Sequence, residues 1–416
     1  MAHTLSFKKT TLAIALLGAT IGTAQADCGI TSSGTVNILS NDFPALQTVA
    51  SRAEQCATDS VTVTKNQTTE HKNIQVPALT TNPASYSVAV ISNSSLVPLL
   101  NDDLVQPLDE LVEKYGQNLQ DSQLIKIDGK VMAIAFMANA QHMWYRKDLF
   151  EQAGLDAPAS YEDVLAAASA LREQGILENP IAANLKAGWD LGAEFVNMYT
   201  GFGGELFAQG SAEATINNEA GIKTLEMLKE LSSFMSPDFV TYNSNEVSPL
   251  WESGEIAMYN GWGSRAGGML DPEGKAIEQV RDNSGFISAP MVGGGDVPAT
   301  RLWWDGFAIA KNISAEDADA SFQAMMHALS PDLLADHASE AVWLIDGYEP
   351  TPASAGVIAT VQAKAKPFPM IPYMGLMHTA LGDNLSEFLQ GQESAEQALN
   401  DATAAYTVAA KEGGFL

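Results

Sequence analysis

The chain has 416 residues, of which 46% are hydrophobic and 17% charged, so its composition is that of a globular protein and excludes intrinsic disorder. This length predicts two globular units rather than one core. The 22 basic residues are outnumbered by 50 acidic ones, giving a formal net charge of −28. Because such a charge repels phosphate groups, we expect the protein to bind no nucleic acid.

The N-terminal segment has the layout of a secretory signal peptide. Lys8 and Lys9 precede an apolar run over 11–22, and a small-x-small cleavage site follows at 24–26. The run is shorter than the roughly 20 apolar residues that a membrane anchor needs, and Thr and Gly interrupt it. We therefore predict a signal peptide over 1–26 and export to the periplasm of a Gram-negative type of cell.

Only two cysteines are present, Cys28 and Cys56. In an exported protein such a pair is more often a disulfide than a metal or catalytic site, so we predict a disulfide that ties the first strand to the first helix. A lipid on Cys28 is the alternative. The residue before it is the charged Asp27, where lipidation requires a small residue, and this favours a free periplasmic protein.

Strands and helices alternate from Thr35 onward. Apolar runs and helical periodicity predict, in chain order, a strand over 36–39, a helix over 45–57, strands over 61–63 and 87–91, and a polar loop over 92–95. This order is typical of α/β proteins.

Later helices have recognisable start signals. Ser160 and Asp163 form a capping box for a helix over 161–174, which Gly175 ends. Two more helices and a mostly helical C-terminal quarter follow: Asn217 or Asn218 begins a helix that ends at Ser236, Ser314 begins one that runs to Ser330, and 381–411 is Ala-rich. Because no linker rich in Pro, Gly or Ser separates these elements, we predict two α/β lobes that share the chain through several crossings, with the binding site in the cleft between them.

Common catalytic and metal-binding motifs are missing from the sequence. It contains no HExxH, no GxSxG, no Walker loop and no GxGxxG after a strand, and its six histidines are scattered. We therefore expect no metal and no cofactor. With fifty acidic residues, a glycosidase-type pair of carboxylates is neither excluded nor supported by counting.

Tryptophan is distributed in two ways. Trp189, Trp262 and the pair Trp303 and Trp304 lie beside glycines, in turns or at the start of a strand. Indole rings in such positions stack on the apolar faces of sugars, while neighbouring Asn, Asp and Arg side chains bind hydroxyls. The alternative for each of them is packing in a core or hinge. Three others lie within apolar helical or strand patterns and are predicted to be core residues: Trp144, Trp251 and Trp343.

One long stretch resembles a known family. Residues 144–155, followed by Pro158 and the helix start at 160–163, resemble the YNKDLFEKAGL-P-TWDE stretch of the carbohydrate-binding proteins of ABC importers, the extracellular solute-binding protein family 1. Shorter matches follow in the same order along the chain, at 250–258, 306–310, 368–372, 389–391 and 396–399. Together they cover nearly the whole mature chain.

The resemblance implies a two-lobed periplasmic-binding-protein fold of type II, in which several hinge crossings join the lobes. It implies an N-terminal lobe over 27–138 plus about 305–343 and a C-terminal lobe over 139–304 plus about 344–416. Such a protein captures a sugar between its lobes and delivers it to the permease subunits of an ABC transporter in the inner membrane. We expect a monomer. Driving closure from 1:99 to 99:1 takes about 5.5 kcal/mol of differential affinity, so the ligand must contact both lobes.

The resemblance, carried over position by position, also implies the ligand-binding residues. They are Asp42, Asn93, Ser94, Asn139, Trp189, Trp262, Arg265, Trp303, Trp304, Asp305 and His378. The alternatives are a helix cap for Asp42 and a plain turn for Asn93 and Ser94. Because side chains alternate along a strand, only one of the paired tryptophans faces the cleft, and both remain candidates.

The chain departs from the maltodextrin-binding members of the family. It has Asn139 where they carry an acid, and 91–94 lacks their aromatic and acidic residues. This favours a mono- or disaccharide, a polyol or a sugar derivative over a long glucan. Two other functions remain open: a periplasmic carbohydrate-active enzyme with a carboxylate pair in the same cleft, and a ligand-loaded partner of a chemoreceptor or sensor.

Overall fold

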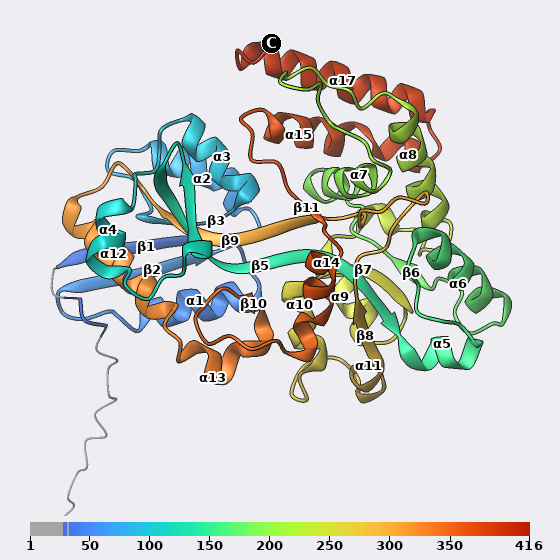
Figure 1. Cartoon of the computed structure of the whole chain (residues 1–416), viewed down its shortest axis with the longest axis horizontal. Coiled ribbons are helices and arrows are strands. Elements are labelled where there is room, and N and C mark those ends of the chain that lie inside the picture. The colour runs from blue at the N-terminus through green and yellow to red at the C-terminus, as the bar shows by residue number, and fades with distance from the viewer. Residues whose placement is uncertain (1–27, 31–32) are drawn as a thin grey trace, which may run out of the picture.

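The computed structural model describes residues 28–30 and 33–416, which form two α/β lobes side by side (Figure 1). The predicted signal peptide over 1–26 lies outside the described residues. Among the helices of the described part, none has both the length and the hydropathy of a membrane span.

The first lobe is built on a parallel sheet in which β1 lies between β2 and β3. Its strands are β1 Gly34–Ser40, β2 Val61–Gln67, β3 Val88–Ser92, β4 Leu124–Ile127 and β10 Val342–Trp343. Its helices are α1 Pro44–Glu54, α2 His71–Thr80, α3 Asn93–Asn101, α4 Asp109–Tyr115, α12 Ala315–Ala328 and α13 Leu333–His337. Because the three central strands are parallel, their carboxyl ends lie at one edge of the sheet, where α2 and α3 begin.

The second lobe is mostly helical around a small sheet. Its strands are β6 Ile181–Ala182, β7 Met258–Trp262 and β8 Ser284–Ile287. Its helices are α5 Lys147–Ala153, α6 Tyr161–Glu173, α7 Trp189–Gly201, α8 Glu219–Ser232, α9 Ser244–Glu252, α10 Gly263–Leu270, α11 Glu278–Asn283, α14 Ala355–Gln362, α15 Met374–Asn384, α16 Ser386–Leu389 and α17 Ala395–Glu412. Short 3₁₀ helices lie at Phe239–Thr241 and Pro352–Ser354 in this lobe and at Asp121–Gln123 and Ala338–Glu340 in the first lobe.

Two strands pass from one lobe to the other. They are β5 Lys130–Arg146, which has 17 residues, and β9 Arg301–Ile309, which also pairs with the short β11 Lys366–Pro367. Within the first lobe, β5 pairs with β4, β9 and β10, and its last residues pair with β7 and β8 of the second lobe. The path β2-β1-β3-β9-β5-β7-β6 is therefore continuous (Figure 1). The strands of the two lobes therefore belong to one continuous sheet, which the sequence had not predicted.

The predicted helix starts are confirmed. Ser160 Oγ accepts a hydrogen bond from Asp163 N (3.1 Å), and Asp163 Oδ2 accepts one from Ser160 N (2.9 Å). Asn218 caps α8 through Gly221 N (2.9 Å), and Ser314 Oγ accepts from the third residue of α12. Both of these helices end a few residues before the Ser-Pro pairs that were predicted to end them.

The polar loop predicted over 92–95 is wrong, because α3 begins directly after β3. Ser95 Oγ accepts a hydrogen bond from Ser92 N (3.0 Å), so two of the serines that suggested a loop cap the first turn instead. The predicted core tryptophans are confirmed: the exposed fractions are 0% for Trp144 and Trp251 and 2% for Trp343.

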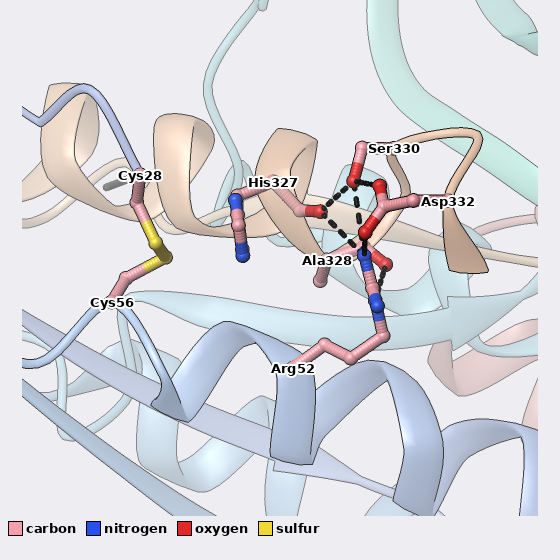
Figure 2. Close-up of polar contacts among 7 residues, drawn as sticks. All are labelled: Cys28, Arg52, Cys56, His327, Ala328, Ser330 and Asp332. Atoms are coloured by element: carbon pink, nitrogen blue, oxygen red, sulfur yellow. Dashed lines mark hydrogen bonds and ion pairs between the residues drawn. A yellow bond between two sulfur atoms is a disulfide. The ribbon is translucent and has the colours of Figure 1, made fainter. Parts of the chain in front are cut away.

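The predicted disulfide joins Cys28 to Cys56 and ties the segment before β1 to the end of α1 (Figure 2). One turn earlier on α1, Arg52 Nε donates to the carbonyl oxygen of Ala328 (2.9 Å), and its Nη2 pairs with Asp332 Oδ2 (3.0 Å). These contacts satisfy carbonyl groups at the C-terminus of α12 and fix that helix against α1.

Candidate ligand-binding site

Four of the predicted site residues form one aromatic cluster where the lobes meet. Trp189 begins α7, Trp262 ends β7, Trp303 lies on β9 and His378 lies on α15. The ring centre of Trp189 is 6.1 Å from that of Trp262, 5.5 Å from that of Trp303 and 5.2 Å from that of His378. Phe368, 4.2 Å from Trp303, completes the group. We call these five residues the aromatic cluster.

Glycines allow the helices that carry the cluster to approach each other closely. A Cβ atom on Gly382 of α15 would lie 2.0 Å from the carbonyl oxygen of Gly188, and one on Gly192 of α7 would lie 2.7 Å from that of His378. Gly188 itself has a φ of 98° and donates to Gly382 O (3.0 Å). This contact between backbones sets Trp189 against His378.

His378 is a neutral, buried member of the cluster. Burial lowers its pKa to about 4, so its Nε2 donates to the carbonyl oxygen of Trp189 (2.8 Å) as an uncharged imidazole. Its Nδ1 is buried and has no hydrogen-bond partner within the described residues. The same holds for Trp303 Nε1. The cluster therefore contains two buried polar atoms that the protein does not satisfy.

The alternation along β9 separates the paired tryptophans. Trp303 is 6% exposed and packs in the core of the second lobe, whereas Trp304 packs against a core cluster of the first lobe. Asp305, two residues after Trp303, returns to the face of the strand that carries the cluster. Trp303 is therefore the member of the pair that joins the other aromatic residues.

Three charged side chains lie beside the cluster, and only Asp305 among them was predicted from the sequence. Lys72 of α2 reaches from the first lobe and places Nζ 3.8 Å from the ring centre of Trp189. Asp190 follows that tryptophan on α7, and Asp305 lies on β9. Among the described residues, none of the three side chains forms a side-chain hydrogen bond or an ion pair. The ammonium group of Lys72 contacts the indole ring of Trp189, and the charges of Asp190 and Asp305 act on it electrostatically.

Burial shifts the pKa of each of these charged groups toward its neutral form. It raises the pKa of Asp305 to about 7 and that of Asp190 to about 6, and in both cases the charge of Lys72 opposes the shift. It lowers the pKa of Lys72 to about 8, opposed by the two carboxylates. Desolvated ionisable groups of this kind mark candidate functional sites.

Asn93 and Ser94 lie near Asp305, because Ser92 is the register partner of Asp305 in the pairing of β3 with β9. Asn93 is 1% exposed and donates from Nδ2 to Leu302 O (3.2 Å), while its Oδ1 is buried without a partner in the described chain. Ser94 Oγ lies 3.1 Å from Ser92 Oγ. The first turn of α3 thus presents polar groups beside β9.

Three other predicted residues have side-chain partners within the protein. Asn139 Oδ1 accepts from Ser264 N (3.2 Å), so it holds the first turn of α10. Arg265 Nη2 donates to Asn245 Oδ1 (2.7 Å), and its charge lowers the pKa of Asp190 against the larger effect of burial. Asp42 is exposed at the carboxyl end of β1 and accepts from the Gln47 side chain (2.7 Å); it is not the cap of α1, because Phe43 occupies that position.

A buried polar network lies behind Asp190, one turn further along α7. Glu194 Oε1 accepts from Gln141 Nε2 (2.6 Å), and Tyr259 donates to the side chain of Asn184 (2.9 Å). Burial raises the pKa of Glu194 to about 8, with Asp190 adding to the shift. At neutral pH this carboxyl group is therefore mostly protonated and uncharged.

Other features of the described residues lie apart from this site. Cys28, Cys56 and His327 have potential metal ligands within 4.8 Å of one another (Figure 2), but the disulfide leaves no thiolate to bind a metal. A pocket of about 290 Å³ adjoins that disulfide, and a groove of about 760 Å³ lies between α8 and the loop over 292–297. Neither contains a predicted ligand-binding residue.

Comparison with protein families matches residues 44–331 to the model of bacterial extracellular solute-binding proteins. A probable amino-acid ABC transporter periplasmic-binding protein of Sinorhizobium fredii is 22% identical over 293 residues, covering 66% of this chain and 63% of the relative. The mannitol-binding protein of Pseudomonas aeruginosa is 27% identical over 220 residues, covering 52% and 49%. The chain thus aligns with about half to two thirds of the length of these curated relatives.

Solved structures match over almost their whole length. A solute-binding protein from Agrobacterium radiobacter in complex with ribitol has a TM-score of 0.76 at 19% identity, covering 91% of this chain and 99% of that one. Maltose-bound MalE3 of T. maritima has a TM-score of 0.76 at 16% identity, covering 91% and 100%. A mannitol-bound protein from Agrobacterium vitis has 0.75 at 22% identity, covering 92% and 100%. These similarities confirm the predicted two-lobed α/β fold.

Proposed function

The chain belongs to the family of bacterial extracellular solute-binding proteins, and from this premise we propose that it is the periplasmic substrate-binding protein of an ABC transporter for a small carbohydrate. It captures a mono- or disaccharide, a polyol or a sugar derivative between its lobes and presents it to the permease subunits in the inner membrane. The signal peptide over 1–26 belongs to this proposal, because it would bring the chain to the periplasm.

The aromatic cluster at the junction of the lobes carries the proposal. Indole faces such as those of Trp189 and Trp262 stack on the apolar faces of sugar rings and polyol chains. Around them lie buried polar atoms that lack partners among the described residues, on Asn93, Trp303 and His378. A ligand with several hydroxyl groups would satisfy these atoms, whereas an apolar ligand would leave them unsatisfied.

The arrangement also favours recognition by both lobes at once. Lys72 and Asn93 come from the first lobe, Trp189 and Trp262 from the second, and Asp305 from a crossing strand. A ligand that contacts both sets stabilises the arrangement in which the lobes meet, which hinge closure requires. Of the remaining candidates, we propose Ser94 and Arg265 as further contacts, Asp42 as a contact from the edge of the first lobe, and Asn139 and Trp304 as supports of the site.

The lobe boundaries are part of the proposal. We place the first lobe at 27–138 plus about 305–343 and the second at 139–304 plus about 344–416. The buried cores support this division, because one set draws on 36–137 and 307–345 and the other on 143–303 and 353–410. Strands β5 and β9 then cross between the lobes and serve as hinge segments.

Relatives support the class of ligand. Structures similar to this chain hold ribitol, mannitol and maltose, and one curated relative is named for mannitol. The relative from Sinorhizobium fredii is named for an amino acid. The aromatic cluster and the buried polar atoms without protein partners, one donor and two acceptors, favour a polyhydroxylated ligand. An amino acid is the competing outcome of the experiment.

A thermal-shift screen of the mature protein tests the proposal, with monosaccharides, disaccharides, polyols, uronates and amino acids as the panel. A ligand at 100 times its dissociation constant adds about 2.7 kcal/mol of stability, which the screen detects readily. Calorimetry on each hit should show saturable binding with a 1:1 ratio and unchanged ligand afterwards. Turnover of a glycan without saturable binding would identify an enzyme instead, and a gene deletion that leaves sugar uptake intact would identify a purely sensory partner.

A further inference from the structure

Lys72 is the first-lobe side chain that reaches the aromatic cluster of the second lobe. It is the second residue of α2, and its ammonium group lies 3.8 Å from the ring centre of Trp189. This is the geometry of a cation–π contact, in which the negative face of the ring attracts the charge.

The ammonium group also lies within the field of two carboxylates. Asp190 and Asp305 both interact electrostatically with Lys72, although neither forms an ion pair with it among the described residues. The charges of Lys186, Glu246 and Arg265 also act on Asp190. An aromatic face with two carboxylates is the environment in which proteins bind organic ammonium ions.

We propose that Lys72 is an internal cation, which fills an ammonium-binding subsite formed by Trp189, Asp190 and Asp305 and so makes the site select neutral polyhydroxylated ligands over aminated ones. The inference rests on the proposed function, because it concerns the selectivity of the same site. A ligand that carries its own ammonium group would have to approach Lys72 or displace it from the indole face. A neutral hydroxyl group instead finds both an ammonium donor and two carboxylate acceptors.

Loss of the lysine charge should therefore change selectivity rather than only weaken binding. In Lys72→Met the side chain keeps most of its length and can still pack on the indole ring, but the two carboxylates lose their cation. The ammonium group of an aminated ligand can then take the place of Lys72. A lysine that served only as a hydrogen-bond donor would not produce this gain.

Matched pairs of ligands provide the test. The probes are sorbitol, mannitol and glucose, each compared by calorimetry with amino-deoxy derivatives in which a terminal hydroxyl is replaced by an amine, at about pH 7.5, where alkyl amines are charged. The variants are Lys72→Met, Lys72→Arg, which keeps the charge, and Lys126→Met, which makes the same charge change at an exposed position of β4. Circular dichroism verifies that each variant is folded.

We expect the wild-type protein to bind the neutral ligand of each matched pair at least about tenfold more tightly than its amino-deoxy derivative. Lys72→Met should move this ratio at least about tenfold toward the amine, while Lys72→Arg and Lys126→Met leave it near the wild-type value. If Lys72→Met weakens both members of a pair by the same factor, the inference is wrong and the proposed function stands. If the wild-type protein binds none of these neutral probes but binds amino acids, both the proposed function and the inference are wrong.

Discussion

Asn139 and Trp303 are direct register partners in the antiparallel pairing of β5 with β9. The amide of Asn139 holds the backbone of Ser264 in the first turn of α10, two residues after Trp262. The ring centre of Trp303 lies 5.8 Å from that of Trp262. This pair of facing residues thus positions Trp262 in two ways: Asn139 fixes the backbone that follows it, and Trp303 packs against its ring.

Trp262→Ala should weaken carbohydrate binding by about 1.5 to 3 kcal/mol, because it removes an indole face from the ligand and from the cluster. Isothermal titration calorimetry with the best ligand of the screen measures the change. Phe202→Ala is the control, since Phe202 is a half-buried aromatic beside Gly293, in the groove apart from the site. A loss below about 0.3 kcal/mol for Trp262→Ala would make this residue structural only.

Ligand binding should change the tryptophan emission of the protein, because Trp189, Trp262 and Trp303 lie in one cluster at the proposed site. A fluorescence titration should give the same dissociation constant as calorimetry. The signal should fall strongly in Trp189→Phe and Trp262→Phe, and it should survive in Trp251→Phe, whose ring is buried in a separate core. A signal that depends on Trp251 alone would place the ligand elsewhere.

Glu194→Gln should remove part of the pH dependence of stability. Burial raises the folded-state pKa of Glu194 from 4.5 to about 8, so between these values the folded chain keeps a proton that the unfolded chain has lost. Wild-type stability therefore falls as pH rises through this window, and above it the full cost of the buried charge remains. Glutamine resembles the protonated form and avoids that cost.

Urea unfolding at about pH 5 and pH 8.5 measures this effect. The difference in unfolding free energy between Glu194→Gln and wild type should increase by on the order of 2 to 4 kcal/mol from pH 5 to pH 8.5. Glu273→Gln, at an exposed position before Gly274, should show little change. An equal effect of pH on the wild type and on Glu194→Gln would contradict the buried, protonated carboxyl group.

Replacement of Cys28 and Cys56 by serine should lower the free energy of unfolding by about 3 to 4 kcal/mol, because the disulfide closes a loop across a sequence separation of 28 residues. Ligand affinity should stay within about twofold of wild type, since the bond lies beside α1 and α12 and not in the aromatic cluster. Denaturant unfolding and calorimetry on the same preparation separate the two quantities. A large loss of ligand affinity at unchanged unfolding free energy would contradict the prediction that the disulfide stabilises the fold without affecting the ligand-binding site.

The tryptophans of the aromatic cluster could be singled out from the sequence because their local sequence is unusual. Trp189 and Trp262 lie beside glycines, which bring helices and strands close together, and this pattern distinguishes them from Trp144 and Trp251 in the core. Alternation along β9 likewise predicted that Trp303 and its neighbour face opposite ways. Which of the two joins the cluster depends on the register between β5 and β9, and a single strand sequence does not contain that information.

Lys72 and Asp190 were not predicted, because only tertiary structure brings them beside the aromatic cluster. Lys72 lies in the polar stretch that begins α2, where a lysine is most often a solvated surface residue, and Asp190 resembles an ordinary acidic residue in the first turn of a helix. They meet only when α2 of one lobe approaches α7 of the other. The Ser-Asn-Ser-Ser segment was misread for a related reason, since its composition suits both a loop and a capped helix start.

Strand β5 has a consequence for any attempt to cut the protein into halves. Its 17 residues hydrogen-bond in both lobes, so a fragment that ends within it would leave β9 on one side, or β7 and β8 on the other, with unpaired backbone groups. Exposed edges of this kind pair with other chains and aggregate. A reporter that splits this binding protein between its lobes would therefore require cuts in surface loops on both crossings and reassembly of the shared sheet.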